Sequence, residues 1–198
     1  IKAKIAGALF TTLEAEGVDY TVTVIAPYPA VCIDWNGMVD CAAPQAPVIP
    51  GHFYQGSIGT ASSGVPDAFD AVIMDPWTGW WRPEAFKVVV GMTDGEKSPN
   101  AAAAAADYQL VLDGLMGAGN YTVHTVSGLL PAAAILQPGE PLANGACNGK
   151  DESGPALKAQ QLSINTGGLR ASVCGFDAQP LFTAIAQSSI TAAIPCEL

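Results

Sequence analysis

Asp94 is the carboxylate best placed in this sequence to take part in ligand chemistry. It follows the largely apolar run 88–92 and comes directly before Gly95. Apolar runs of this kind form buried strands of parallel sheets, and ligands of open α/β sheets bind at the carboxyl ends of such strands. Asp94 is therefore a candidate metal ligand. A structural alternative, in which its carboxylate caps a turn or a helix, fits the same position.

A hydroxyl-rich turn precedes the segment 66–74, which we expect to be helical. It contains Thr60, Ser62 and Ser63. Hydroxyl side chains before a helix are typical capping residues, so capping is the simplest interpretation from the residues alone.

Residues for other common chemistries are scarce. The sequence contains neither a P-loop nor a glycine-rich dinucleotide motif, and Ser57 lacks the first glycine of a G-x-S-x-G motif. His52 and His124 lie in different segments without metal-binding spacing, and the cysteines lack C-x-x-C spacing, so we expect no zinc site. No pair of nucleophile and base is visible, and we expect no enzyme.

The first two of the five cysteines flank a predicted hairpin. Asn36-Gly37 is the strongest signal for a two-residue hairpin turn, and around it Cys32 faces Cys41. The two cysteines then form a non-hydrogen-bonded pair with Cα atoms about 4.5 Å apart, within the range of a disulfide. We therefore expect a Cys32–Cys41 disulfide and an oxidising compartment, with two free thiols as the alternative.

Helical and extended patterns alternate along the whole chain. Amphipathic or capped segments predict helices over 2–16, 66–74, 101–116, 155–164 and 177–187. Apolar, β-branched segments predict strands over 18–25, 53–58, 85–92, 121–126 and 169–174, and the tail 190–198 is expected to be extended. This order predicts a three-layer α/β fold, a doubly wound and mostly parallel sheet with the 88–92 strand near its centre. Residues 27–52 and 128–154 are two Pro- and Gly-rich insertions into this single domain, 1–198.

The topology also predicts which of the remaining three cysteines pair with each other. Cys147 lies in the insertion after the 121–126 strand, and Cys174 ends the 169–174 strand, so both start from the carboxyl edge of a parallel sheet. The last helix leads the chain away from that edge toward Cys196. We expect a Cys147–Cys174 disulfide that pins the second insertion, with Cys196 unpaired within this chain. The rival pairing is Cys174–Cys196, which requires the tail to fold back along the helix.

Composition narrows the class of protein further. The 198 residues are 49% hydrophobic and 13% charged, which excludes a disordered chain. The net charge is −10 and the eight basic residues are scattered, so no footprint for nucleic acid or an anionic membrane is present. No apolar run reaches the roughly 18 residues of a membrane span. Sparse Lys with much Ala, Gly, Thr and Ser is typical of secreted or surface proteins.

The run 88–95, VVVGMTDG, resembles the fourth-strand motif of von Willebrand factor type A (vWA) domains. The segments WWRPEA at 80–85, GGLRASVC at 167–174 and IPCEL at 194–198 resemble those of bacterial secreted or lipoprotein members of that family. The resemblance implies a vWA or Rossmann-like fold and a role in adhesion.

The resemblance also implies a metal-ion-dependent adhesion site that binds Mg²⁺. Asp94 matches its last ligand, and Thr60 its threonine, with Ser62 as the second choice. Thr60 and Asp94 should then lie close together. The D-x-S-x-S motif and the first strand of the family do not occur in these residues. We therefore expect a fragment of a longer chain, or a strand supplied by another segment, and no tightly held ion on the two ligands alone.

These observations favour an adhesion or binding module that is extracellular, at the cell surface or periplasmic, as part of a larger surface or fibre assembly. Its expected partner is a protein or its own missing N-terminal segment. A structural scaffold module without a working metal site is the alternative, and a hydrolase is less favoured. A divalent cation is expected only where D-x-S-x-S is supplied upstream.

Overall fold

The computed structural model describes residues 6–25, 48–49, 53–56, 81–93, 101–129, 135–146, 155–174 and 177–193. The chain divides into two units: Ile1–Thr60 with Ala71–Arg82 and Ala178–Leu198, and Ala61–Asp70 with Pro83–Asp177. We call them unit 1 and unit 2. The predicted 66–74 helix and the Cys32–Cys41 hairpin lie outside the described residues.

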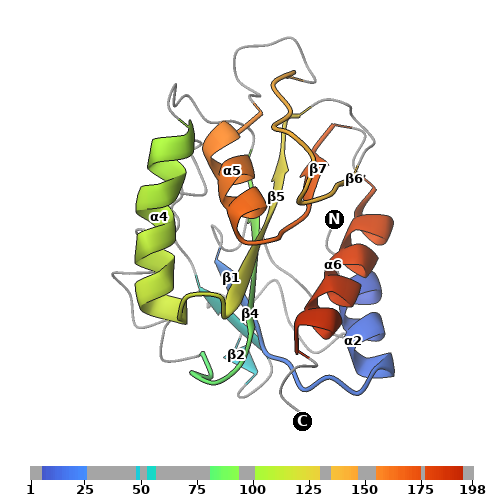
Figure 1. Ribbon diagram of the computed structural model, residues 1–198. Coiled ribbons are helices and arrows are strands. Elements are labelled where there is room, and N and C mark those ends of the chain that lie inside the picture. The colour runs from blue at the N-terminus through green and yellow to red at the C-terminus, as the bar shows by residue number, and fades with distance from the viewer. Residues whose placement is uncertain are drawn as a thin grey trace. The chain divides into compact units, whose positions relative to one another are not determined.

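Unit 2 contains a four-stranded sheet with the order β4-β5-β7-β6 (Figure 1). The strands are β4 (Lys87–Met92), β5 (Tyr121–Ser127), β7 (Arg170–Ser172) and β6 (Ile135–Leu136). The first three are parallel, and β6 runs antiparallel to β7. Helices α4 (Ala101–Met116) and α5 (Leu157–Asn165) lie side by side on one face of the sheet. The predicted α/β class with parallel strands is thus confirmed.

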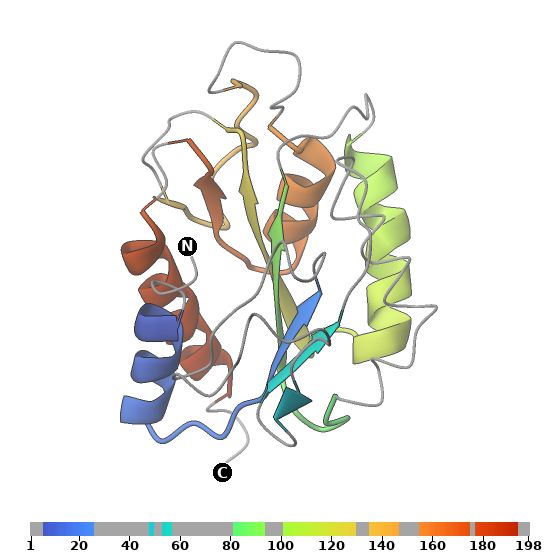
Figure 2. The ribbon, with the colours of Figure 1, turned by 180° about the vertical axis from the view of Figure 1, so that it is seen from behind.

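Unit 1 combines helices with a small sheet. The π-helix η1 (Ala6–Phe10) continues into α2 (Thr11–Ala15), and both pack against α6 (Ala178–Ala193), as Figure 2 shows for the blue and red helices. In the sheet, β1 (Val22–Ile25) pairs in parallel with β3 (Phe53–Gly56), which pairs antiparallel with β2 (Val48–Ile49).

Strand β5 forms the centre of unit 2, and all seven of its residues are buried. Four of them are polar, so each needs an internal hydrogen-bond partner. The Thr125 hydroxyl lies 2.7 Å from the Ser163 hydroxyl and donates to the Ala159 carbonyl of α5 at 2.9 Å. These bonds attach helix α5 to the middle of the sheet.

Two expectations about elements are wrong. Strand β4 was expected near the sheet centre, but it is an edge strand of the four-stranded sheet in the described part of the chain. An apolar run predicts a strand but does not determine how many strands flank it, and in β4 only Gly91 is fully buried. Helix α6 continues to Ala193, although 190–198 was expected to be extended. The small residues at its end are compatible with a helix, and no glycine or proline follows Pro180 of its first turn before that point.

Candidate functional site

The carboxyl edge of the parallel strands is where the sequence placed the site. The Thr93 backbone N–H donates to the Val126 carbonyl at 2.9 Å, which continues the β4–β5 ladder one residue beyond β4. Asp94 is therefore the residue that directly follows this edge. Asp94, Thr60 and Ser62 themselves lie outside the described residues, so their expected proximity stays a prediction.

The hydroxyls at the ends of β5 and β7 are used within the fold. Ser127 Oγ donates to the Pro155 carbonyl at 3.0 Å, and Ser172 Oγ donates to the Leu129 carbonyl at 2.7 Å. They hold the ends of loops against the strand ends. Among the described residues, no group of three or more His, Cys, Asp or Glu side chains could hold a metal ion.

Cys174 is disulfide-bonded at this edge. Its partner lies outside the described residues, as do Cys32, Cys41, Cys147 and Cys196. The choice between Cys147 and Cys196 therefore stays a prediction.

Arg170 anchors the second insertion from within the core. Its guanidinium is fully buried and donates to the backbone carbonyls of Gln137, Glu140 and Pro141 at 2.7–2.9 Å. Desolvation lowers the pKa of Arg170, and the Glu140 charge offsets part of that effect. An arginine stays protonated under such conditions, so one charge is held in a cage of carbonyl oxygens.

Gln160 of α5 holds the same insertion through its side-chain amide. Its Oε1 accepts from the Ala143 N–H at 3.0 Å, and its Nε2 donates to the Ala143 carbonyl at 2.9 Å. The described part of the insertion, 135–146, is thus fixed by side chains of α5 and β7. The sequence predicted a pinned insertion but assigned the pinning to a disulfide alone.

His124 is buried in β5, and one of its ring nitrogens accepts a backbone hydrogen bond. Its Nδ1 accepts from the Leu169 N–H at 2.9 Å, so Nε2 carries the proton of the neutral ring. Nε2 has no hydrogen-bond partner in the part of the chain that the structure describes, and desolvation lowers the pKa of His124 to about 4. His124 is therefore a core residue of β5.

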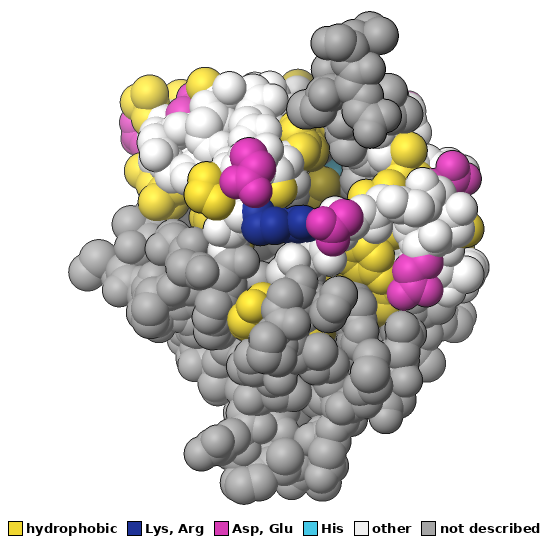
Figure 3. All heavy atoms as spheres, turned by 90° about the horizontal axis from the view of Figure 1, so that it is seen from below, with side chains coloured by type: hydrophobic (Ala, Val, Ile, Leu, Met, Phe, Trp, Pro, Cys, Tyr) yellow, Lys and Arg dark blue, Asp and Glu magenta, His cyan; other side chains and the backbone are white. Residues whose placement is uncertain are grey.

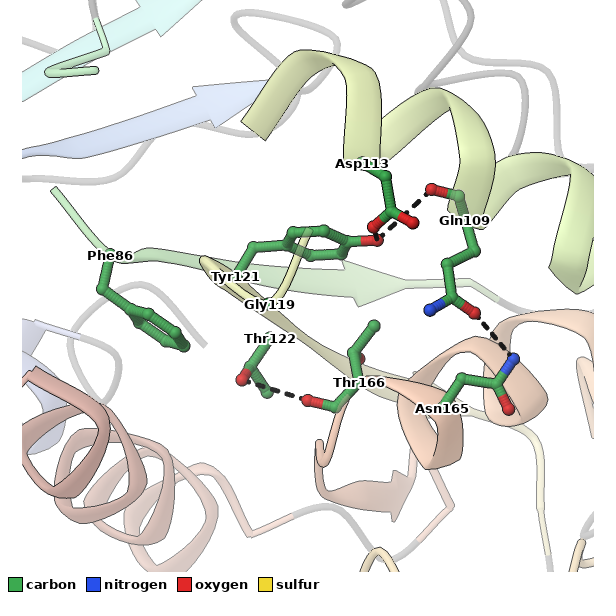
Figure 4. Close-up of a pocket in the computed structure, with 8 residues that line it drawn as sticks. All are labelled: Phe86, Gln109, Asp113, Gly119, Tyr121, Thr122, Asn165 and Thr166. Atoms are coloured by element: carbon green, nitrogen blue, oxygen red, sulfur yellow. Dashed lines mark hydrogen bonds between the residues drawn. The ribbon is translucent and has the colours of Figure 1, made fainter. Parts of the chain in front are cut away.

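A cavity of about 250 Å³ opens at the other end of unit 2, at the amino ends of β4 and β5 (Figure 4). We call it the amino-edge pocket. Side chains of α4, β5 and the end of α5 line it, together with one residue that precedes β4. Those that matter below are Phe86, Gln109, Asp113, Tyr121, Asn165 and Thr166.

Two hydrogen bonds fix the polar side chains of the amino-edge pocket. Tyr121 Oη donates to Asp113 Oδ1 at 2.8 Å, and Asn165 Nδ2 donates to Gln109 Oε1 at 3.0 Å. Burial, together with the Asp113 carboxylate, raises the pKa of Tyr121 above its ordinary value. Asp113 Oδ2 and Gln109 Nε2 have no hydrogen-bond partner among the described residues.

The sequence interpretation missed this pocket. A signal was present, because Gln109 and Asp113 are four residues apart and therefore share one face of the predicted 101–116 helix. The bond from Tyr121 to Asp113 depends on how α4 packs beside β5, which no local pattern specifies.

Among the described residues on the face shown in Figure 3, the basic side chains form one short stretch bordered by acidic side chains. Arg82 of unit 1 is ion-paired with Asp19, and its Nη2 also donates to the Asp19 carbonyl at 3.0 Å. The positive charge of Arg82 is therefore compensated locally.

Comparison of the chain with protein-family models, with curated proteins and with solved structures finds no significant match. None of the helices in the described ranges is long and apolar enough to cross a membrane.

Proposed function

We propose that the protein is a binding module of the vWA type that acts outside the cell, at the cell surface or in the periplasm. In this proposal the fold is a three-layer, doubly wound vWA or Rossmann-like domain with two disulfide-pinned insertions. Its ligand is a protein within a larger surface or fibre assembly. Recognition takes place at the carboxyl edge of the β4–β5–β7 sheet.

The observation that carries the proposal is the hydrogen bond from the Thr93 N–H to the Val126 carbonyl. It holds the start of the Thr-Asp-Gly motif at the carboxyl end of a parallel strand, which is where α/β proteins bind ligands. Asp94 then supplies a carboxylate at that edge, and Thr60, or Ser62, supplies a hydroxyl. Carboxylate and hydroxyl oxygens are hard ligands that suit Mg²⁺.

A further strand belongs to the proposal. In the described part of the chain, β4 pairs only with β5, and Val88 and Met92 are 36% and 41% exposed. An apolar edge strand of this kind is a template for pairing with another strand. We propose that this strand comes from an upstream segment that carries D-x-S-x-S, or from a partner protein.

The test uses Mn²⁺, which prefers the same hard oxygen ligands as Mg²⁺ and broadens NMR signals of nearby nuclei. We expect weak binding to the 198-residue chain, with broadening centred on the amide signals of Thr93 and Asp94. The Asp94→Asn variant should lose this local broadening. Asp107→Asn is the matched control, because Asp107 is an exposed residue within α4 and, unlike Asp94, does not follow the end of a strand.

Broadening that is centred elsewhere, or that persists in Asp94→Asn, would contradict the metal site. The scaffold alternative, in which the fold carries no working metal site, would then be favoured.

A further inference from the structure

The amino-edge pocket has the chemistry of a ligand site, and it lies at the opposite end of the unit 2 strands from the proposed metal site. We propose that it binds a neutral, polyhydroxylated ring, that is, a single monosaccharide unit.

The polar side chains of the pocket are held in place before any ligand arrives. Asp113 is fixed by Tyr121, and Gln109 is fixed by Asn165, which in turn accepts from Gln161 Nε2 at 2.9 Å. We call the Tyr121–Asp113 and Asn165–Gln109 hydrogen bonds the frame bonds. Each of them uses only one polar atom of the Asp113 or Gln109 side chain. Binding therefore costs little side-chain ordering, because the rotamers are already restricted.

The two unused atoms define the ligand. Asp113 Oδ2 is an acceptor, and Gln109 Nε2 is a donor that points into the space bordered by Tyr121 and Thr166 (Figure 4). An acceptor and a donor one helical turn apart fit two neighbouring hydroxyls, since a hydroxyl both donates and accepts. A simple ammonium group would pair with Asp113 but would leave the Gln109 donor without an acceptor.

The charge and the shape of the pocket also favour a small neutral sugar ring. Among the described residues that line the pocket, Asp113 is the one charged side chain, so anionic ligands are repelled. The rings of Phe86 and Tyr121 provide apolar surface for the C–H groups of a sugar ring. At about 250 Å³ the cavity is slightly below the usual range of ligand sites, roughly 300–1,000 Å³, which limits the ligand to one small ring.

The probes are D-glucose, D-galactose and D-mannose, titrated separately into the ¹⁵N-labelled 198-residue chain. We expect at least one of them to shift the side-chain amide signals of Gln109 and the backbone signals of Tyr121 and Thr122. A ligand of this size predicts a Kd of a few millimolar, and because the ligand is neutral this Kd should not change with NaCl concentration.

Two conservative variants each change one of the two unused atoms and preserve the frame bonds. One replaces the acceptor of Asp113 by a donor, and the other replaces the donor of Gln109 by an acceptor. Asp113→Asn still accepts from Tyr121, and Gln109→Glu still accepts from Asn165. Each should weaken sugar binding about tenfold or more. The double variant again has one donor and one acceptor, although at exchanged positions. Sugar hydroxyls can rotate to match them, so the double variant should bind sugar more tightly than either single variant. Asp107→Asn on the same helix should leave the Kd unchanged.

Three results would overturn the proposal. The first is that no sugar shifts the pocket signals up to about 50 mM, roughly ten times the expected Kd. The second is that n-propylammonium binds in a salt-dependent way and the sugars do not. The third is that both single variants, with unchanged circular dichroism and signal dispersion, bind sugar as well as the original chain.

Discussion

At the scale of single residues, His124 couples the stability of the fold to pH. Its pKa is about 4 in the folded protein and about 6.5 in the unfolded chain. Between these values the unfolded chain binds a proton that the folded protein does not, so the free energy of unfolding falls as the pH falls. The expected loss from pH 7 to pH 4 is roughly 3 kcal/mol, and below pH 4, where the folded protein also becomes protonated, this residue contributes less than about 1 kcal/mol more.

Urea unfolding between pH 7 and pH 4 measures this loss. The His124→Asn variant provides the comparison, because an amide oxygen can still accept from the Leu169 N–H and does not titrate. The contribution of His124 is the difference between the two curves. Parallel curves would mean that the histidine is protonated equally in both states.

Arg170 provides the second prediction at this scale. Arg170→Met removes three partly buried hydrogen bonds from a charged donor to backbone carbonyls, and we expect it to lower the free energy of unfolding by about 3 kcal/mol or more. Arg82→Met is the matched control. It removes an ion pair with the exposed Asp19, and such surface pairs contribute about 0–1 kcal/mol. Equal losses in chemical denaturation would show that the carbonyl cage does not stabilise the fold.

At the scale of elements, two glycines of unit 2 should respond oppositely to alanine. A Cβ on Gly168 would lie 1.8 Å from the Val123 carbonyl oxygen, so the backbone before β7 would have to move away from β5. We expect Gly168→Ala to destabilise the protein by at least about 2 kcal/mol. Gly114 lies in α4, no atom of the described residues comes within 4 Å of its Cβ position, and Gly114→Ala should stabilise the helix by about 0.5–1 kcal/mol.

Thermal unfolding distinguishes the two substitutions. At this chain length, 1 kcal/mol corresponds to about 2–4 °C in Tm. The prediction for Gly168 is wrong if the Tm of its alanine variant equals or exceeds that of the original chain.

The same scale explains why the strands were misjudged. The 88–92 run of apolar residues suggested a central strand, and the polar residues of 121–126 gave no sign of complete burial. The structure has the reverse: β4 is a half-exposed edge strand and β5 is buried throughout. Polar side chains can be buried in a strand when they form hydrogen bonds with partners such as Ser163. Ser163 belongs to helix α5, which is distant from β5 in the sequence.

At the scale of the whole molecule, the pairing of the cysteines provides a prediction. Non-reducing peptide mapping should find Cys147 joined to Cys174, and Cys32 joined to Cys41. A Cys174–Cys196 peptide would overturn the pairing and, with it, the expectation that Cys196 awaits a partner outside this chain.

The second insertion should also keep its place without a disulfide. Gln160 and Arg170 hold 135–146 by hydrogen bonds, so the Ala143 amide should remain protected from hydrogen exchange after reduction. Gln160→Ala should remove that protection whether or not the chain is reduced. Loss of protection on reduction alone would show that the disulfide is the main anchor.

The sequence by itself determined the class of fold and many of its elements. The predicted helix 101–116 matches α4 in full, 155–164 overlaps α5 at 157–165, and 121–126 differs from β5 by one residue. These elements were predictable because side-chain periodicity, helix caps and breakers act between near neighbours in the chain. The alternation of helices and strands then implies parallel pairing.

Only the tertiary structure decided which side chains meet. The position of β4 at a sheet edge, the carbonyl cage around Arg170, the buried His124 and the amino-edge pocket all join residues from separate elements. Asp113 and Tyr121, for example, acquire their shared hydrogen bond only when β5 is paired beside β4 and α4 packs on the sheet. Such contacts depend on strand order and helix packing, which local patterns leave undetermined, because several arrangements bury the same apolar faces equally well.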